Sequence, residues 1–148
     1  MKDVTNSAIE VSSVPAAVID VVWADVAPML ERATARSRGR YTVEAAREGI
    51  ESGVLGLWIA MDDAKPIAAL TTRIEDFPTG KRGLTIDWIG GDRMKDWLPE
   101  AHEVLTDYAK AHGCSYLQGY GRKGWLRALA KHGWEVDYTA YRMEIDNG

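Results

Sequence analysis

At 148 residues the chain is long enough for one domain that buries roughly two thirds of its unfolded surface, and its 46% hydrophobic and 27% charged residues exclude a mainly disordered protein. The net charge of -4 argues against a chain that coats nucleic acid along its whole surface. A lone cysteine, Cys114, excludes an internal disulfide, and no apolar run approaches the ~20 residues of a membrane helix. We therefore expect a single domain over residues 1–148, in the cytoplasm.

The first third of the chain predicts one strand followed by two helices. Residues 9–11 alternate apolar and polar side chains, as a short strand does. Every fourth residue from 14 to 30 is apolar, which is the spacing of an amphipathic helix. Pro28 lies inside this pattern and predicts a kink or a break. Thr42 is a typical N-cap for a second helix, and Gly53 is a typical stop.

The middle of the chain predicts an antiparallel meander. Residues 55–61 form a nearly continuous apolar run, as expected of a strand covered on both faces. A turn containing Pro66 leads into a second strand over residues 67–75, and a turn rich in glycine leads into a third over residues 84–91.

The last third predicts a helix that starts near Trp97 and stops at Gly113, a strand over residues 116–119, a helix over residues 125–131 and a closing strand over residues 134–145. A right-handed crossover would make the 116–119 strand a parallel neighbour of the meander's last strand. The fold class that we predict is α/β (α+β), a mixed, mostly antiparallel twisted central sheet with helices on both faces.

Two stretches carry a resemblance to a known family. One is Ala-Lys-Ala-His-Gly-Cys at residues 109–114, and the other begins Gly-Arg-Lys-Gly-Trp and continues to Gly-Trp over residues 121–134. In this element order they resemble the second half of GNAT acyltransferases, and they are similar to small GNAT-like proteins encoded by tailed bacteriophages. The resemblance implies a phage origin. It also implies that the pantetheine arm of an acyl-CoA enters between the meander's last strand and the 116–119 strand.

The family cradles the CoA phosphates with Arg or Gln followed by glycines where a strand opens into a helix. Aligned on residues 109–113, Arg93 falls at the basic position, whereas Asp96 and Leu98 replace the glycines. A carboxylate and a branched side chain there would repel and crowd a phosphate ligand.

Gly90 and Gly91 offer a displaced cradle together with the amides of residues 92–95. The alternative is a strand bulge followed by an ordinary N-cap at Asp92. With acetyl-CoA as the implied cofactor and no metal, the expected binding residues are Ile89, Gly90, Gly91, Arg93, Met94, Lys95, Arg122 and Lys123.

Asp87 and Tyr120 are the catalytic candidates. Asp87 stands in the meander's last strand, where some family members carry the carboxylate that accepts the amine proton through water; a structural ion pair or an exposed sheet face is the alternative. The family's tyrosine acid aligns with Leu129, so Tyr120, Tyr138 and Tyr141 are the candidates to replace it, unless they are half-buried core residues. We expect Cys114 to be structural.

Residues 110–134 carry no Asp or Glu although the whole chain is acidic, and we expect a locally positive face there. The face would attract the CoA phosphates or an acidic substrate, or it would bind nucleic acid or an acidic protein, unless it is only a solvated helix surface. Its five cations are Lys110, Arg122, Lys123, Arg127 and Lys131.

Two functions follow from these features. One is an acyl-CoA-dependent N-acyltransferase that acetylates an amine. The other is a GNAT-like phage protein without catalytic activity, which acts in virion assembly or binds a host protein or nucleic acid through the basic face. The first places the protein in the host cytoplasm, and the second allows it to be part of the virion.

Overall fold

The computed structural model describes residues 9–146. Within them, no helix combines the length and apolarity needed to cross a membrane. The elements in chain order are β1 (Ile9–Val14), η2 (Ala16–Val18), α1 (Ile19–Thr34), α2 (Val43–Ser52), β2 (Gly56–Asp62), β3 (Lys65–Asp76), β4 (Arg82–Gly91), α3 (Met94–Ala111), β5 (Tyr116–Gly119), α4 (Lys123–Leu129) and η3 (Ala130–His132).

The strands form one five-stranded sheet in the order β1-β2-β3-β4-β5. The pairs from β1 to β4 are antiparallel, and β5 runs parallel to β4. The predicted meander and the parallel crossover are both confirmed. The ladder between β4 and β5 joins only four residue pairs and ends at Ile86 and Gly119. The last five residues of β4 therefore run past the end of β5.

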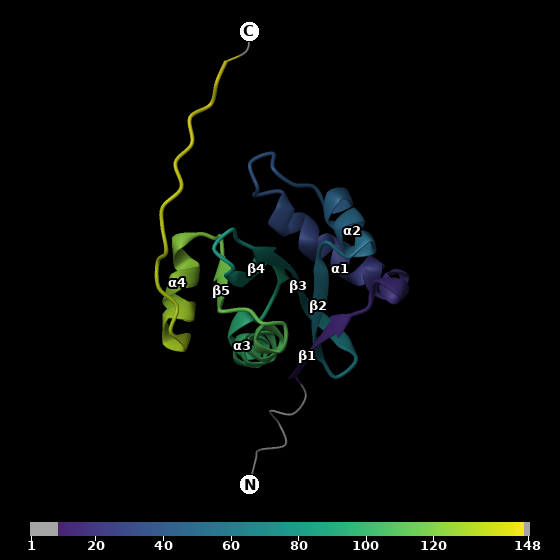
Figure 1. Cartoon of the computed structure of the whole chain (residues 1–148). Helices are drawn as coiled ribbons and strands as arrows, with labels where there is room; N and C mark the ends of the chain where they lie inside the picture. Colours follow the sequence, from purple (N-terminus) through teal and green to yellow (C-terminus); the bar gives the residue numbers. More distant parts are fainter. Residues whose placement is uncertain (1–8, 147–148) are drawn as a thin grey trace.

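Helices cover both faces of the sheet, as predicted (Figure 1). On one face, α1 and α2 pack on a buried cluster that includes Val26, Leu30 and Leu57. On the other face, α3 packs on a second cluster that includes Leu84 and Leu105. The sheet is the shared wall of the two clusters, because successive side chains of a strand point to opposite faces.

The helix ends form where the sequence predicts them. Thr42 Oγ1 accepts a hydrogen bond from the Ala45 amide at 3.1 Å and caps α2. Gly53 closes α2 with φ of 85°, and Gly113 follows α3 with φ of 74°. Both glycines adopt the left-handed conformation that costs other residues energy.

Helix α1 continues through Pro28, so of the two expected outcomes, a kink or a break, the break into two helices does not occur. Proline removes one backbone hydrogen bond, but it leaves the apolar stripe of the helix unchanged. Val26 and Leu30 flank Pro28 in sequence and are both fully buried against the sheet. Burial on both sides of the proline therefore keeps the helix in one piece.

The closing strand predicted over residues 134–145 does not form, and the chain has no regular secondary structure from Trp134 to the last described residue. This C-terminal segment leaves the body of the protein next to α4 (Figure 1). Gly133, with φ of 92°, turns the chain there, and Trp134 is held on α3 by a hydrogen bond from its Nε1 to His102 Nε2 at 3.0 Å. An alternating pattern gives strand propensity, but a strand also needs a partner edge.

Candidate active site on strands β3, β4 and β5

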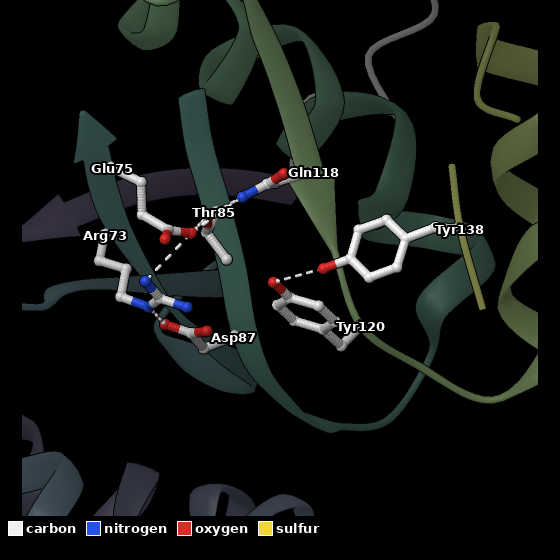
Figure 2. Close-up of polar contacts among 7 residues, drawn as sticks. All are labelled: Arg73, Glu75, Thr85, Asp87, Gln118, Tyr120 and Tyr138. Carbon is white, nitrogen blue, oxygen red and sulfur yellow. Dashed lines mark hydrogen bonds and ion pairs between the residues drawn. The ribbon is translucent and has the colours of Figure 1, made fainter. Parts of the chain in front are cut away.

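Polar side chains gather on one face of the sheet where β3, β4 and β5 lie side by side. Thr85 of β4 is in register with Arg73 of β3 and with Gln118 of β5, which places the three in one row. Glu75 and Asp87 lie two residues from members of that row, and the two-residue period puts them on the same face. Figure 2 shows these five side chains together.

Arg73 joins the two carboxylates of this cluster. Its Nε lies 2.9 Å from Asp87 Oδ2, and its Nη1 lies 3.1 Å from Glu75 Oε1. The three side chains are mostly shielded from solvent, so the attraction between them is stronger than between exposed charges. The guanidinium fixes both carboxylates, and one negative charge remains uncompensated.

Glu75 is the anchored member of the pair. Its Oε1 accepts hydrogen bonds from Thr85 Oγ1 at 2.7 Å and from Gln118 Nε2 at 2.8 Å. These bonds and the charge of Arg73 lower the pKa of Glu75, the bond from Thr85 most of all. Glu75 is therefore ionised at neutral pH, and its Oε1 is the atom that Thr85, Gln118 and Arg73 all contact.

Asp87 is in a different environment. Its side chain is only 9% exposed, and burial raises the pKa of this carboxyl although the charge of Arg73 opposes the rise. A carboxylate whose pKa is moved toward neutrality is a better general base than an exposed one. The sequence left a functional role and an ion pair as alternatives for Asp87, and the structure shows that the ion pair exists.

A bulge in β4 sets the position of Asp87. On β3, Thr72 pairs with Ile86 and Leu70 pairs with Ile89. Two residues of β4, Asp87 and Trp88, therefore lie opposite the single β3 residue Thr71. Such a bulge bends a strand and redirects its side chains. The bulge lies just beyond the point where the ladder to β5 ends, and Asp87 is thus the first β4 residue past the β4–β5 ladder.

Tyr120 follows β5 and contacts the C-terminal segment. Its hydroxyl lies 3.3 Å from that of Tyr138, and the two side chains are 57% and 61% exposed. The hydrogen bond to Tyr138, partial burial and the charge of Glu75 together raise the pKa of Tyr120 to about 12. Tyr120 therefore remains a hydrogen-bond donor at any physiological pH.

At the predicted phosphate cradle, the backbone of neighbouring elements packs directly against Gly90 and Gly91. A Cβ on Gly90 would lie 1.9 Å from the backbone oxygen of Met29, and one on Gly91 would lie 2.4 Å from the oxygen of Ile67. Both glycines still belong to β4. The predicted bulge therefore lies earlier in the strand than these glycines.

Helix α3 starts at Met94, and its N-cap is Arg93 in the left-handed conformation with φ of 62°, which corrects the N-cap expected at residue 92. The Arg93 guanidinium contacts Asp62 at 2.5 Å and Asp96 at 2.8 Å. The amides of Met94 and Lys95 have no carbonyl partner within the helix because they belong to its first turn. These amides and the exposed Lys95 side chain suit a phosphate, whereas the carboxylates around Arg93 do not.

The remaining candidates lie elsewhere. Arg122 and Lys123 are exposed at the start of α4. Cys114 is partly buried, and burial raises the pKa of its thiol, which disfavours the nucleophilic thiolate. Within residues 9–146, no group of three or more His, Cys, Asp or Glu side chains is arranged to hold a metal ion.

The sequence did not identify Arg73, Glu75, Thr85 or Gln118 as site residues. A signal for two of them was present, because Arg73 and Glu75 stand two residues apart in a strand that is otherwise apolar or threonine-rich. Charged side chains at this spacing in an interior strand share a face, and a buried charge requires a partner. The partner itself, Asp87, lies 14 residues away and depends on the register of the β3–β4 pair.

No protein-family model matches the chain, and no curated protein matches it in sequence. Solved structures do match it. The ribosomal-protein-alanine N-acetyltransferase of Brucella melitensis biovar Abortus 2308 superposes with a TM-score of 0.68 over 94% of this chain and 100% of its own, at 18% identity. The chain has the GNAT acetyltransferase fold.

Two further structures with the GNAT fold agree. An aminoglycoside acetyltransferase from an uncultured soil metagenomic sample gives a TM-score of 0.70 at 11% identity, over 93% of this chain and 99% of its own. A predicted acetyltransferase from Clostridium acetobutylicum, solved with acetyl-CoA, gives 0.67 at 15% identity, over 92% and 96%. Identities this low establish the GNAT fold alone.

Proposed function

We propose that the protein is an N-acetyltransferase that transfers the acetyl group of acetyl-CoA to an amine. The observation that carries the proposal is Asp87, a mostly buried carboxylate held by Arg73 just past the end of the β4–β5 ladder. The GNAT fold supports it, since one similar structure contains acetyl-CoA and others are named as transferases to ribosomal-protein alanine and to aminoglycosides.

Asp87 is the proposed base. An amine attacks a thioester only as the free base, so its ammonium form must first lose a proton. Asp87 Oδ2 is engaged by Arg73, which leaves Oδ1 to accept that proton directly or through one water molecule. Arg73 holds the carboxylate in position and opposes its neutralisation, because its charge lowers the pKa that burial raises.

Backbone amides of β4 are the proposed donors to the thioester oxygen. The ladder to β5 ends at Ile86, so the β5-facing edge of residues 87–91 has no ladder partner. Amides fixed in a strand need no rearrangement when charge develops on an oxygen. Ile89, Gly90 and Gly91, which the sequence predicts to bind acetyl-CoA, lie on this part of β4.

Tyr120 is a hydrogen-bond donor to the leaving sulfur in this mechanism. A thiol has a pKa of about 8.5, so a thiolate cannot remove the proton from a phenol whose pKa is about 12. Tyr120 therefore stabilises the thiolate by a hydrogen bond and keeps its own proton. Solvent or the acceptor's ammonium group supplies the proton that the sulfur finally takes.

The start of α3 is the proposed phosphate site. The free amides of Met94 and Lys95 and the Lys95 ammonium group would hold the phosphates, and Arg93 would join them after exchanging Asp62 or Asp96 for a phosphate oxygen. The neighbouring carboxylates weaken this site relative to a glycine-rich one. Acetyl-CoA supplies the activated acetyl group.

Calorimetric titration with acetyl-CoA and with CoA tests the proposal. We expect acetyl-CoA to bind, and we expect Arg93→Ala to weaken this binding. Asp87→Asn should leave acetyl-CoA binding intact but lower kcat/KM for acetyl transfer by about 10²-fold or more. Asp107→Asn, at an exposed position of α3, is the matched control. No heat at millimolar ligand, or full turnover by Asp87→Asn, would rule the proposal out.

The basic face supports the second candidate function, a GNAT-like protein without catalytic activity. Among residues 9–146 its cations Lys110, Arg122, Lys123, Arg127 and Lys131 are all exposed, and none forms an ion pair with another described residue. This function predicts no acetyl-CoA binding and association with a phage or host partner or with nucleic acid that weakens with salt. A phage origin and a place in the cytoplasm or the virion remain predictions.

A further inference from the structure

A second basic surface lies at the end of α1 and in the connection that leads to α2. Residues 32–40 contain four arginines, and no Asp or Glu occurs from residue 32 to residue 43. We call this segment the arginine loop, and its arginines are Arg32, Arg36, Arg38 and Arg40, all of them exposed. Arginine presents a planar fork of donors that matches a carboxylate or a phosphate.

Hydrogen bonds fix the backbone of the arginine loop. Ser37 is buried at its centre, where its Oγ donates to the Tyr41 carbonyl at 3.1 Å and accepts from the Tyr41 amide at 3.0 Å. Arg40 Nη1 donates to the Ser37 carbonyl at 3.3 Å. Because the backbone is fixed around Ser37, the Arg36 and Arg38 side chains are displayed at the surface.

The loop borders the candidate active site. Tyr41, the residue that follows the loop, packs on Trp88 with ring centroids 5.2 Å apart. Trp88 follows Asp87 in the β4 bulge. One aromatic contact thus connects the arginine loop to the residue next to the proposed base.

The chain's own C-terminal segment already contacts this loop. Arg142 Nη1 donates to the Arg38 carbonyl at 3.1 Å, and Glu144 Oε2 lies 3.9 Å from Arg38 Nη2. Arg142 contributes most to lowering the pKa of Glu144, and Arg38 and Arg40 add to it. The segment therefore brings to the loop a hydrogen-bond donor, Arg142, and the Glu144 carboxylate that Arg142 also binds.

The same segment also contacts the site. Tyr138 meets Tyr120 beside the polar cluster of Arg73 and Asp87, as Figure 2 shows. Six residues later in the chain, Glu144 meets Arg38. One extended peptide thus runs from the proposed reaction centre to the arginine loop. Six extended residues span about 20 Å. A peptide acceptor with its amine at the proposed reaction centre would need this length to contact the arginine loop.

We propose that the arginine loop selects the acetyl acceptor, which is an extended polypeptide with acidic side chains about six residues from the reacting amine. The inference rests on the proposed acetyl transfer. A peptide fits better than a nucleic acid, because the loop offers the Arg38 carbonyl as well as guanidinium groups, and the phosphate groups that would bind the arginines carry no donor for a carbonyl. The C-terminal segment then competes for the same surface.

Two peptides of equal length test the proposal. Both begin with alanine, and residues six to eight are glutamates in one and lysines in the other. We expect about tenfold higher kcat/KM for the acidic peptide at low salt, as a few exposed ion pairs supply, and loss of the preference at high salt. Equal use of the two peptides at low salt would overturn the proposal.

Charge-reversal variants locate the effect. Arg36→Glu and Arg38→Glu should each remove most of the preference for the acidic peptide. Turnover of a small amine that carries no other charged group should stay unchanged. Lys110→Glu is the matched control, because it changes the net charge equally at an exposed position on α3, on the other face of the sheet. A loss of preference in Lys110→Glu as large as in Arg36→Glu would contradict the location.

Fluorescence anisotropy of the same labelled peptides separates this inference from the proposed function. If acetyl-CoA does not bind, the acetyltransferase proposal fails, and the acceptor inference fails with it even if acidic peptides bind the loop. If acetyl transfer occurs without acidic preference, only the inference fails. Deleting residues 141–148 should tighten acidic-peptide binding, and unchanged binding would count against the inference. Tighter binding of a single-stranded oligonucleotide than of the acidic peptide would overturn the choice of a peptide.

Discussion

Two carboxylates that share one arginine have opposite pKa shifts in this protein. Glu75 accepts three kinds of donor, from Thr85, Arg73 and Gln118, and its pKa falls. Among the described residues, Arg73 alone donates a hydrogen bond to the Asp87 side chain, which is more deeply buried than that of Glu75, so the pKa of Asp87 rises. Hydrogen bonds to the charged form and loss of water act in opposite directions on a carboxyl group. This difference separates the anchoring residue from the one that is able to exchange a proton.

His102 gives a prediction about pH. Its Nε2 accepts from Trp134, its ring stacks on His132 with centroids 4.4 Å apart, and burial and then His132 lower its pKa. The unfolded chain therefore binds a proton before the folded one does as pH falls through about 6.5, and stability is lost in that direction. We expect the Trp134 indole N–H resonance to shift and the free energy of unfolding to fall below that pH.

The control for this prediction is His112, whose exposed ring contacts the carbonyl and the ring of Tyr108 one helical turn earlier. His112→Gln should leave the response of the Trp134 resonance in place, and His102→Gln should abolish it. A response that survives His102→Gln would show that another group holds the C-terminal segment.

At the scale of elements, the contact between α1 and β4 depends on Gly90. The Met29 carbonyl of α1 occupies the space where a side chain would stand. Gly90→Ala must push the helix from the sheet, and we expect a loss of at least about 1–3 kcal/mol in the free energy of unfolding. Denaturation with urea measures it.

Gly124 is the matched control for that substitution. It lies in α4, and beyond its chain neighbours and the backbone of its own helix no atom stands within 4 Å of the place that an added methyl group would take. Gly124→Ala should therefore be neutral or slightly stabilising. Equal effects of the two substitutions would show that the Met29 carbonyl does not restrict the side chain at residue 90.

Strands and helices were predicted well where local spacing decides them. The Thr42 cap, the Gly53 and Gly113 stops and the 116–119 strand all form as predicted. The predicted strand over residues 134–145 was wrong, although its alternation is clear. Val136, Tyr138, Tyr141, Met143 and Ile145 remain exposed. Alternation states which side chains share a face, and it cannot state whether a neighbouring strand is within reach.

At the scale of the whole molecule, one sheet joins the two hydrophobic clusters. Because β2, β3 and β4 contribute side chains to both, we expect the single predicted domain to unfold in one cooperative transition. Leu30→Ala on one face and Leu105→Ala on the other should each cost about 2–5 kcal/mol without splitting the transition. Two resolved transitions, by fluorescence and circular dichroism, would contradict a single cooperative unit.

The sequence by itself determined the order and type of nearly all the elements and their GNAT-like arrangement, because spacing, caps and turn residues act over a few neighbouring positions. It also placed Asp87 in the last strand of the meander, which carries part of the candidate site. Only the tertiary structure decided that Arg73 is its partner, that the β4 bulge sets its position, and that the C-terminal segment lies on the arginine loop. These features depend on strand register and on contacts between residues as far apart as Arg38 and Arg142, which local patterns do not specify.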